Sequence, residues 1–273
     1  MSSFEFLTLK SFESPLHGLR SGPPGPSAVH IHGTWGNFYE NPFALGLTTT
    51  YRRAGWSYAS VNTSGHDGGS IQEDFEASLP EIADWVDYLC PDGDPVILQG
   101  HSLGALKILR LLQDQQYAEL RARTFAVVLL SLFDLVAFNG GVGDELRERR
   151  AMAQRLMAEQ GDEALVTADI FDAWPLSVRT YLEATTVGGR WDLLPTRKKS
   201  AGAVRNVDLP TLVAIGGSDF ASYPDPATAA EIIGQQVPTA SVAFIDGAPH
   251  NFAGHEDLLA KAISDFLRVL PDN

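Results

Sequence analysis

The chain has 273 residues, of which 44% are hydrophobic and 20% are charged, a composition typical of a globular protein and not of a disordered or fibrous one. At roughly 150 residues per domain, this length fits one large domain or one domain with an insertion. The formal net charge of −14 disfavours binding to the phosphate backbone of nucleic acids. No apolar run approaches the roughly 18 residues that span a bilayer. We therefore expect neither a nucleic acid partner nor a membrane span.

Two further features concern the cellular compartment. The N-terminal sequence MSSFEFLTLK lacks a basic segment followed by an apolar stretch, so we expect no secretory signal and a cytoplasmic location. Cys90 is the single cysteine, which excludes an intramolecular disulfide and a multi-cysteine metal site. The sequence does not indicate an oligomeric state.

Short apolar runs rich in Val, Ile or Ala recur along the chain and predict strands that are buried on both faces. These runs are residues 28–31, 57–61, 95–99, 125–130, 211–215 and 241–245. Segments with helical spacing lie between them, such as Phe75–Leu89, in which Pro80 is expected to introduce a kink, and 258–270 at the C-terminus. This alternation predicts an α/β fold with a mostly parallel sheet and helices on both of its faces.

The alternation stops between residues 139 and 206. This segment begins with the charge-dense, helix-like sequence GDELRERRAMAQRLMAEQ and continues with scattered aromatic residues. An insertion of this size after a strand is typical of a helical lid. We therefore expect a core formed by 1–138 and 207–273, with a lid or cap formed by 139–206.

The sharpest motif is GHSLG at residues 100–104, which matches G-x-S-x-G. It follows a predicted strand and precedes the helical run 105–112, which is the context that a nucleophile elbow requires. In such a turn the two glycines allow close backbone approach and the serine side chain is exposed at the start of the helix. Ser102 is therefore the candidate nucleophile, and the alternative interpretation is a glycine-rich turn with a capping serine.

A serine hydroxyl needs a base that takes its proton and an acid that orients the base. In this architecture the acid precedes the histidine along the chain, and both follow later strands. Asp219, in GGSDF, is the preferred acid. Asp134, in SLFD after the preceding strand, is its main rival, and Asp225 is a weaker one.

The candidate base is His250, in DGAPHNF, which follows the last predicted strand. Its rival is His255, which we expect at the start of the last helix. The order Ser102, Asp219, His250 is the order that the motif requires.

Attack on an ester carbonyl creates an oxyanion that backbone N–H groups must stabilise. One donor is expected at Leu103, directly after the nucleophile. The second is expected in the loop HGTWG after the first central strand, where Thr34 is preferred and Trp35 is next.

Residues at the ends of these strands and in the insertion are candidates for the substrate pocket. His66 has an alternative interpretation as half of a hydrogen-bonded loop pair with Asp67, and the aromatic residues of the insertion equally well pack it onto the core. The candidates are Trp35, Phe38, Tyr39, His66, Trp174 and Tyr181.

The motifs HGTWGNFYEN, GHSLGA, GGSDF and GAPHNF together resemble serine hydrolases of the α/β-hydrolase superfamily over essentially the whole chain. HGTWGNFYEN with NTSGHD further resembles a branch that includes fungal siderophore esterases and bacterial relatives. That branch tends to carry arginine where this chain has Ser64, so no substrate contact is carried over there. The resemblance implies an eight-stranded sheet with one antiparallel strand near the N-terminus, a lid after the sixth strand, and hydrolysis through an acyl-enzyme.

These features predict a cofactor-free and metal-free hydrolase of carboxylic esters, lactones or thioesters that acts on a small or medium apolar metabolite. The same fold and site also serve acyl transfer, C–C or C–CN lyase and cyclase chemistry, because a fold does not fix a reaction. A metal-dependent hydrolase is a second class, suggested by His30 and His32, which share one face of a strand. A non-catalytic ligand-binding protein on the same scaffold is a third.

Overall fold

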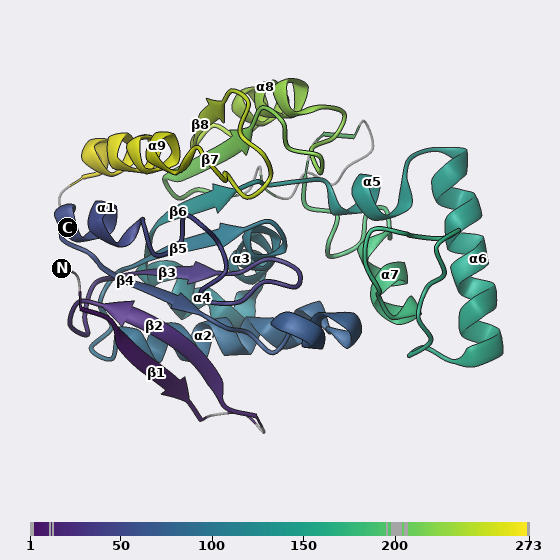
Figure 1. Ribbon diagram of the computed structural model, residues 1–273, viewed down its shortest axis with the longest axis horizontal. Helices are drawn as coiled ribbons and strands as arrows, with labels where there is room; N and C mark the ends of the chain where they lie inside the picture. The colour runs from purple at the N-terminus through teal and green to yellow at the C-terminus, as the bar shows by residue number, and fades with distance from the viewer. Residues whose placement is uncertain are drawn as a thin grey trace.

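A single eight-stranded sheet runs through the molecule (Figure 1). The computed structural model describes residues 3–10, 12, 14–194, 196–197, 204 and 207–271. The strands are β1 (Glu5–Leu9), β2 (Leu16–Ser21), β3 (Ser27–Ile31), β4 (Ser57–Val61), β5 (Val96–His101), β6 (Thr124–Leu130), β7 (Thr211–Gly216) and β8 (Ala240–Ile245). Their order across the sheet is β1-β2-β4-β3-β5-β6-β7-β8. β2 is antiparallel to both of its neighbours and the remaining pairs are parallel. The predicted α/β class and mostly parallel eight-stranded sheet are therefore confirmed.

Helices cover both faces of the sheet and extend beyond one end of it. They are α1 (Thr48–Arg53), α2 (Ser78–Leu89), α3 (Leu103–Gln113), α4 (Ala118–Arg123), α5 (Leu135–Gly140), α6 (Asp144–Gln160), α7 (Val178–Ala184), α8 (Pro226–Gln236) and α9 (Glu256–Val269), with short 3₁₀ segments η1 (Asp67–Gln72), η2 (Phe75–Ala77) and η3 (Gln115–Tyr117). None of these described helices is long and apolar enough to cross a membrane.

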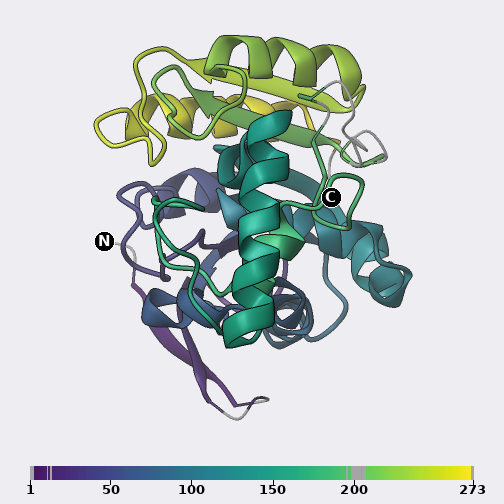
Figure 2. The ribbon, with the colours of Figure 1, turned by 90° about the vertical axis from the view of Figure 1, so that its right-hand side faces the viewer.

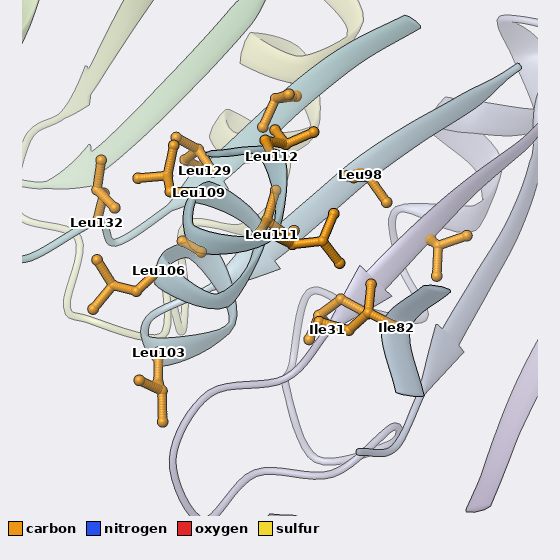
Figure 3. Packing of buried hydrophobic residues seen from close by; sticks show 14 of the residues in the cluster. Ile31, Ile82, Leu98, Leu103, Leu106, Leu109, Leu111, Leu112, Leu129 and Leu132 are labelled. Carbon is orange, nitrogen blue, oxygen red and sulfur yellow. The ribbon is translucent and has the colours of Figure 1, made fainter. Parts of the chain in front are cut away.

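The sheet divides the buried core into two layers. On one face, apolar residues of α2 and α3 pack against β3, β5 and β6, and those of α8 pack against β7 and β8. Figure 3 shows the leucines of α3 in this layer, with Leu98 and Leu129 of the sheet and Ile82 of α2. On the other face, Tyr51 of α1 and Leu259 of α9 belong to a second cluster. Because both faces are covered, β3, β4 and β5 are buried along their whole length.

The structure departs from the sequence prediction at two places near the N-terminus. The β1–β2 hairpin was not found from the residues, because its strands are only half buried and β2 contains Gly18 and Arg20. The helical stripe that begins at Phe75 is not one helix, since η2 precedes α2. Pro80 therefore lies in the first turn of α2, where its missing N–H has no intrahelical acceptor, and not in the interior of a helix as predicted.

The segment between β6 and β7 carries α5, α6 and α7 and has a small hydrophobic cluster of its own, which includes Ala153, Phe171 and Tyr181. It lies beyond the carboxyl ends of β3, β5 and β6, and α6 runs across that end of the molecule (Figures 1 and 2). The predicted end of the insertion, residue 206, lies outside the described residues.

Candidate active site

The turn that holds Ser102 joins β5 to α3. Ser102 has φ 55° and ψ −121°, a backbone conformation that residues other than glycine rarely adopt. A Cβ atom at residue 100 would lie 2.4 Å from the carbonyl oxygen of Gly104, and one at residue 104 would lie 2.3 Å from the carbonyl oxygen of Ile31. Both positions therefore require glycine, and the strained turn sets the Ser102 hydroxyl at the carboxyl end of the sheet.

Ser102, His250 and Asp219 form one hydrogen-bonded chain. The Oγ of Ser102 lies 2.9 Å from Nε2 of His250, and Nδ1 of His250 lies 2.7 Å from Oδ1 of Asp219. The carboxylate can only accept, so Nδ1 carries the hydrogen and Nε2 is free to accept the serine proton. Burial opposes ionisation of Asp219, but the hydrogen bond from His250 and that from the N–H of Ala221 outweigh it and lower the pKa of this carboxyl.

Two further side chains form hydrogen bonds with the backbone carbonyl of His250. Nε2 of His101 and Oγ of Ser131 both donate to the His250 carbonyl oxygen, over 2.9 Å and 2.6 Å. Burial above all, and the neighbouring His250 ring, lower the pKa of His101 to about 3, so this ring is neutral near pH 7. The ends of β5 and β6 thus fix the loop that carries His250.

The competing residues have other partners. Oδ1 of Asp134 caps α5, and its carboxylate also binds Arg197 at 2.7 Å and Thr196 at 2.8 Å. Asp225 caps α8, and His255 is the half-buried residue that precedes α9. None of these side chains joins the Ser102–His250–Asp219 chain.

The two predicted oxyanion donors come from the first turn of α3 and from the loop after β3. Leu103 is the first residue of α3, where a helix leaves its N–H groups without an acceptor in the helix. Thr34 lies in the loop after β3 and lines the cavity that contains Ser102. A Cβ at Gly33 would lie 2.9 Å from Cβ of Ser102, so the loop packs directly against the serine.

A cavity of about 700 Å³ opens over Ser102 and His250. Its walls come from the loop after β3, from the ends of β6 and β7, and from the segment before α7. The lining residues are Gly33, Thr34, Trp35, Gly36, Glu40, Asn41, Pro42, His101, Ser102, Phe133, Ala173, Trp174, Phe220, Ala221, His250 and Asn251. Of the predicted pocket residues, Trp35 and Trp174 are on this wall.

The other four predicted pocket residues lie elsewhere. Phe38 and Tyr39 contact each other near Phe6 of β1. Nδ1 of His66 pairs with Oδ2 of Asp67 at 2.7 Å, which is the loop pair that formed the alternative interpretation. Tyr181 is buried in the hydrophobic cluster of the insertion, where burial raises the pKa of its hydroxyl to about 12.

Among the residues of the site that were missed from the sequence are two aromatic rings and a histidine. The ring of Phe220 lies 4.9 Å from that of His250, and the ring of Phe133 lies 6.3 Å from it. His101 holds the His250 carbonyl. Phe220 directly follows Asp219, and Phe133 directly precedes Asp134. Their position at a strand end, beside a candidate acid, was the sequence feature that could have identified them.

The pair His30 and His32 does not form a metal site with carboxylates. Nδ1 of His30 lies 2.9 Å from the side-chain amide of Gln99, and both ring nitrogens of His32 are hydrogen-bonded to neighbouring backbone. Within the part of the chain that the structure describes, no three His, Cys, Asp or Glu side chains gather so as to hold a metal ion.

The family model described as "Alpha/beta hydrolase family" matches residues 28–262. The chain therefore belongs to the alpha/beta hydrolase family. No curated protein sequence matches it, and the branch suggested by the N-terminal motifs stays a prediction.

Solved structures share the fold at low sequence identity. Est1E from Butyrivibrio proteoclasticus, with ferulic acid bound, is 19% identical with a TM-score of 0.70 over 97% of this chain and 98% of that one. A thermostable carboxyl esterase from Bacillus coagulans is 13% identical, with a TM-score of 0.67 over 99% of each chain. The siderophore hydrolase EstB from Aspergillus fumigatus is 17% identical, with a TM-score of 0.66 over 98% of each chain.

Proposed function

We propose that this protein is a serine-dependent carboxylic ester hydrolase that works through an acyl-enzyme. The observation that carries the proposal is the hydrogen-bonded chain from Ser102 through His250 to Asp219, at 2.9 Å and 2.7 Å, in which Ser102 and His250 line the cavity. A hydroxyl, an imidazole and a carboxylate in this order are the parts that nucleophilic acyl transfer needs.

In the first half-reaction Nε2 of His250 takes the proton of Ser102 as Oγ attacks the ester carbonyl carbon. Asp219 stabilises the imidazolium that forms. The N–H groups of Thr34 and Leu103 bind the oxyanion of the tetrahedral intermediate. Collapse breaks the bond to the alcohol, which receives the proton from His250, and leaves the acyl group on Ser102.

In the second half-reaction water replaces the alcohol. Nε2 of His250 takes a proton from the water as its oxygen attacks the acyl carbon. The second tetrahedral intermediate then expels Oγ of Ser102, which recovers the proton. The acid leaves and the free enzyme is restored without a cofactor.

The walls of the cavity favour a small or medium apolar substrate. Trp35, Phe133, Trp174 and Phe220 line it, and flat rings of this kind bury apolar groups well. Ala173 and Trp174 come from the segment between β6 and β7, so residues 139–206 act as a lid or cap in this proposal and 1–138 with 207–273 as the core. The esterases among the solved structures with this fold support the same reaction class.

A fluorophosphonate probe tests the nucleophile directly. We expect it to label Ser102, as identified by peptide mass analysis, and we expect Ser102→Ala to lower the hydrolysis of p-nitrophenyl acetate by about 10⁴-fold or more. Ser78→Ala is the matched control, because Ser78 is also buried and its hydroxyl donates to the carbonyl of Phe75. Labelling of another residue, or full activity of Ser102→Ala, contradicts the proposal.

A further inference from the structure

A fully buried ion pair lies behind the loop that follows β3. Lys107 extends from α3, the helix that begins at the nucleophile turn, and its Nζ pairs with Oε1 of Glu73; the two side chains are 0% and 1% exposed. Removing two charges from water is costly, and such a pair is often no more stable than apolar residues of the same volume. Stability alone therefore does not explain this pair, so its remaining contacts indicate its role.

The ammonium group also fixes the direction of a neighbouring hydroxyl. Nζ of Lys107 donates to Oγ1 of Thr63 over 3.2 Å. An ammonium group has only donors, so Oγ1 must accept this bond and its own hydrogen is available for another acceptor. That acceptor is Nε2 of His32, 3.2 Å away.

His32 is consequently held in one tautomer. The backbone N–H of Thr63 also donates to Nε2 of His32, over 3.1 Å, so two donors point at this nitrogen and the ring hydrogen resides on Nδ1. Nδ1 then donates to the carbonyl oxygen of Gly33 over 2.8 Å. Burial first, and the charge of Lys107 second, lower the pKa of His32 to about 3, so the ring is neutral near pH 7 and donates only through Nδ1.

The Gly33 carbonyl shares a peptide plane with the N–H of Thr34. In a planar trans peptide these two groups point in opposite directions. Holding the carbonyl against His32 therefore fixes the direction of the Thr34 N–H, in a loop that packs directly against Ser102.

We propose that the buried Lys107–Glu73 pair is a positioning device for the oxyanion donor Thr34, acting through Thr63 and His32. The inference rests on the proposed function, because it gives these residues a role in the same ester hydrolysis. Lys107, Glu73, Thr63 and His32 are positioning residues, since each acts through the next and none is expected to touch the substrate.

The first test removes the charges as a pair. Lys107→Met combined with Glu73→Gln removes both charges of the pair, so neither partner is left as a lone charge. Loss of one oxyanion donor costs about 10²- to 10³-fold in kcat, and a donor that is only less well oriented is expected to cost about 10-fold. We expect this fall in kcat with KM changed less than about 2-fold, because the oxyanion exists only in the transition state.

A second pair of variants guards against a simple folding defect. Thr63→Val removes the hydroxyl while keeping the side-chain shape. We expect kcat to fall about 3- to 10-fold, which is a part of the effect of losing one oxyanion donor. Thr63→Ser keeps the hydroxyl, and we expect it to have the kcat of the wild type. Thr211→Val is the matched control: Thr211, the first residue of β7, is fully buried like Thr63, and its hydroxyl donates to the Leu209 carbonyl. Equal kcat in wild type, Thr63→Val and the double variant overturns the inference.

The tautomer of His32 gives a readout that does not depend on activity. We expect ¹⁵N NMR of the histidine side chains to show a neutral His32 with its hydrogen on Nδ1, and the signal to move in Thr63→Val but not in Thr211→Val. A hydrogen on Nε2 in the wild type overturns the inference even if Ser102 is labelled by the probe. Full activity of Ser102→Ala, in contrast, contradicts the proposed function. The two failures are therefore distinguishable, because the NMR result reports on His32 and not on the nucleophile.

Discussion

Two buried aspartates follow neighbouring strands and have different surroundings. Asp219, after β7, is 3% exposed, and Asp134, after β6, is 2% exposed. Asp219 accepts hydrogen bonds from Nδ1 of His250 and the N–H of Ala221. Asp134 accepts from Arg197, Thr196 and the first turn of α5. Burial and position at a strand end are the same for both residues, so the loop that faces each carboxylate determines what it does.

The comparison shows why an acid cannot be assigned from its strand alone. The loop after β8 brings an imidazole to Asp219, and an imidazole can both donate and accept a hydrogen bond. The segment before β7 brings a guanidinium to Asp134, and a guanidinium can only donate. The first carboxylate is suited to orient a base, and the second is suited to hold a chain segment in place.

The largest effect that would break this comparison is on activity. In Asp219→Asn the side chain no longer favours the tautomer with a hydrogen on Nδ1 of His250, and we expect kcat to fall by about 10³- to 10⁴-fold. In Asp134→Asn we expect activity within about 3-fold of the wild type. Steady-state hydrolysis of p-nitrophenyl acetate measures both, and a greater loss in Asp134→Asn would assign the acid to β6 instead.

The second effect is on the free energy of unfolding, and here we expect Asp134→Asn to cost more than Asp219→Asn. Asp134→Asn leaves the buried Arg197 without one of its two carboxylate partners, since Arg197 also pairs with Asp192. Loss of one partner of a buried ion pair costs about 3 kcal/mol. Urea denaturation followed by circular dichroism measures the free energy of unfolding, and an unchanged midpoint would show that the pair does not stabilise the fold.

The third effect concerns the ends of β5 and β6, which hold His250 through His101 and Ser131. The folded pKa of His101 is about 3, below the usual 6.5, so the unfolded chain binds a proton that the folded chain does not. The contribution of His101 to stability is complete above about pH 6.5 and is lost toward pH 3, by about 1.4 kcal/mol per pH unit.

His101→Gln separates this titration from the hydrogen bond. A glutamine amide keeps a donor for the His250 carbonyl but takes up no proton. We expect the free energy of unfolding of the variant to fall less steeply from pH 6 to pH 4 than that of the wild type, by about 1.4 kcal/mol per pH unit. Parallel denaturation curves across this range would contradict the role of His101 as a buried neutral ring.

The smallest expected effect distinguishes the aromatic residues at the cavity from those outside it. Phe220→Ala removes a ring from the wall beside His250, and we expect KM for an aryl ester to rise about 3- to 10-fold, corresponding to about 1 kcal/mol of lost ring contact. Phe38→Ala is the control outside the cavity and should leave KM unchanged. An equal change in both variants would indicate that the rings act through folding.

The central strands and the order of the site residues could be predicted because they depend on local pattern. Buried strands read as apolar runs, and the turn at Ser102 is encoded by Gly100 and Gly104, whose neighbours leave no room for a side chain. The positions of Asp219 and His250 followed from chain order after the last two strands. The family model over residues 28–262 confirms the fold class.

What could not be predicted depends on contacts between distant segments. Phe38 and Tyr39 follow Trp35 in the sequence, yet the chain turns toward Phe6 of β1 and takes them away from the cavity. The partner of Asp134 is Arg197, 63 residues further along the chain, and no local pattern joins them. No local pattern in the sequence marks Lys107 as buried, and only the tertiary structure shows its pairing with Glu73.

The end of β5 and the loop after β8 contribute the proposed nucleophile and its proposed base, and 148 residues of chain separate Ser102 from His250. A fragment of this protein that ends before His250 would still contain Ser102 and its strained turn, but it would lack the proposed base. Such a fragment would therefore carry the proposed nucleophile without the group that activates it.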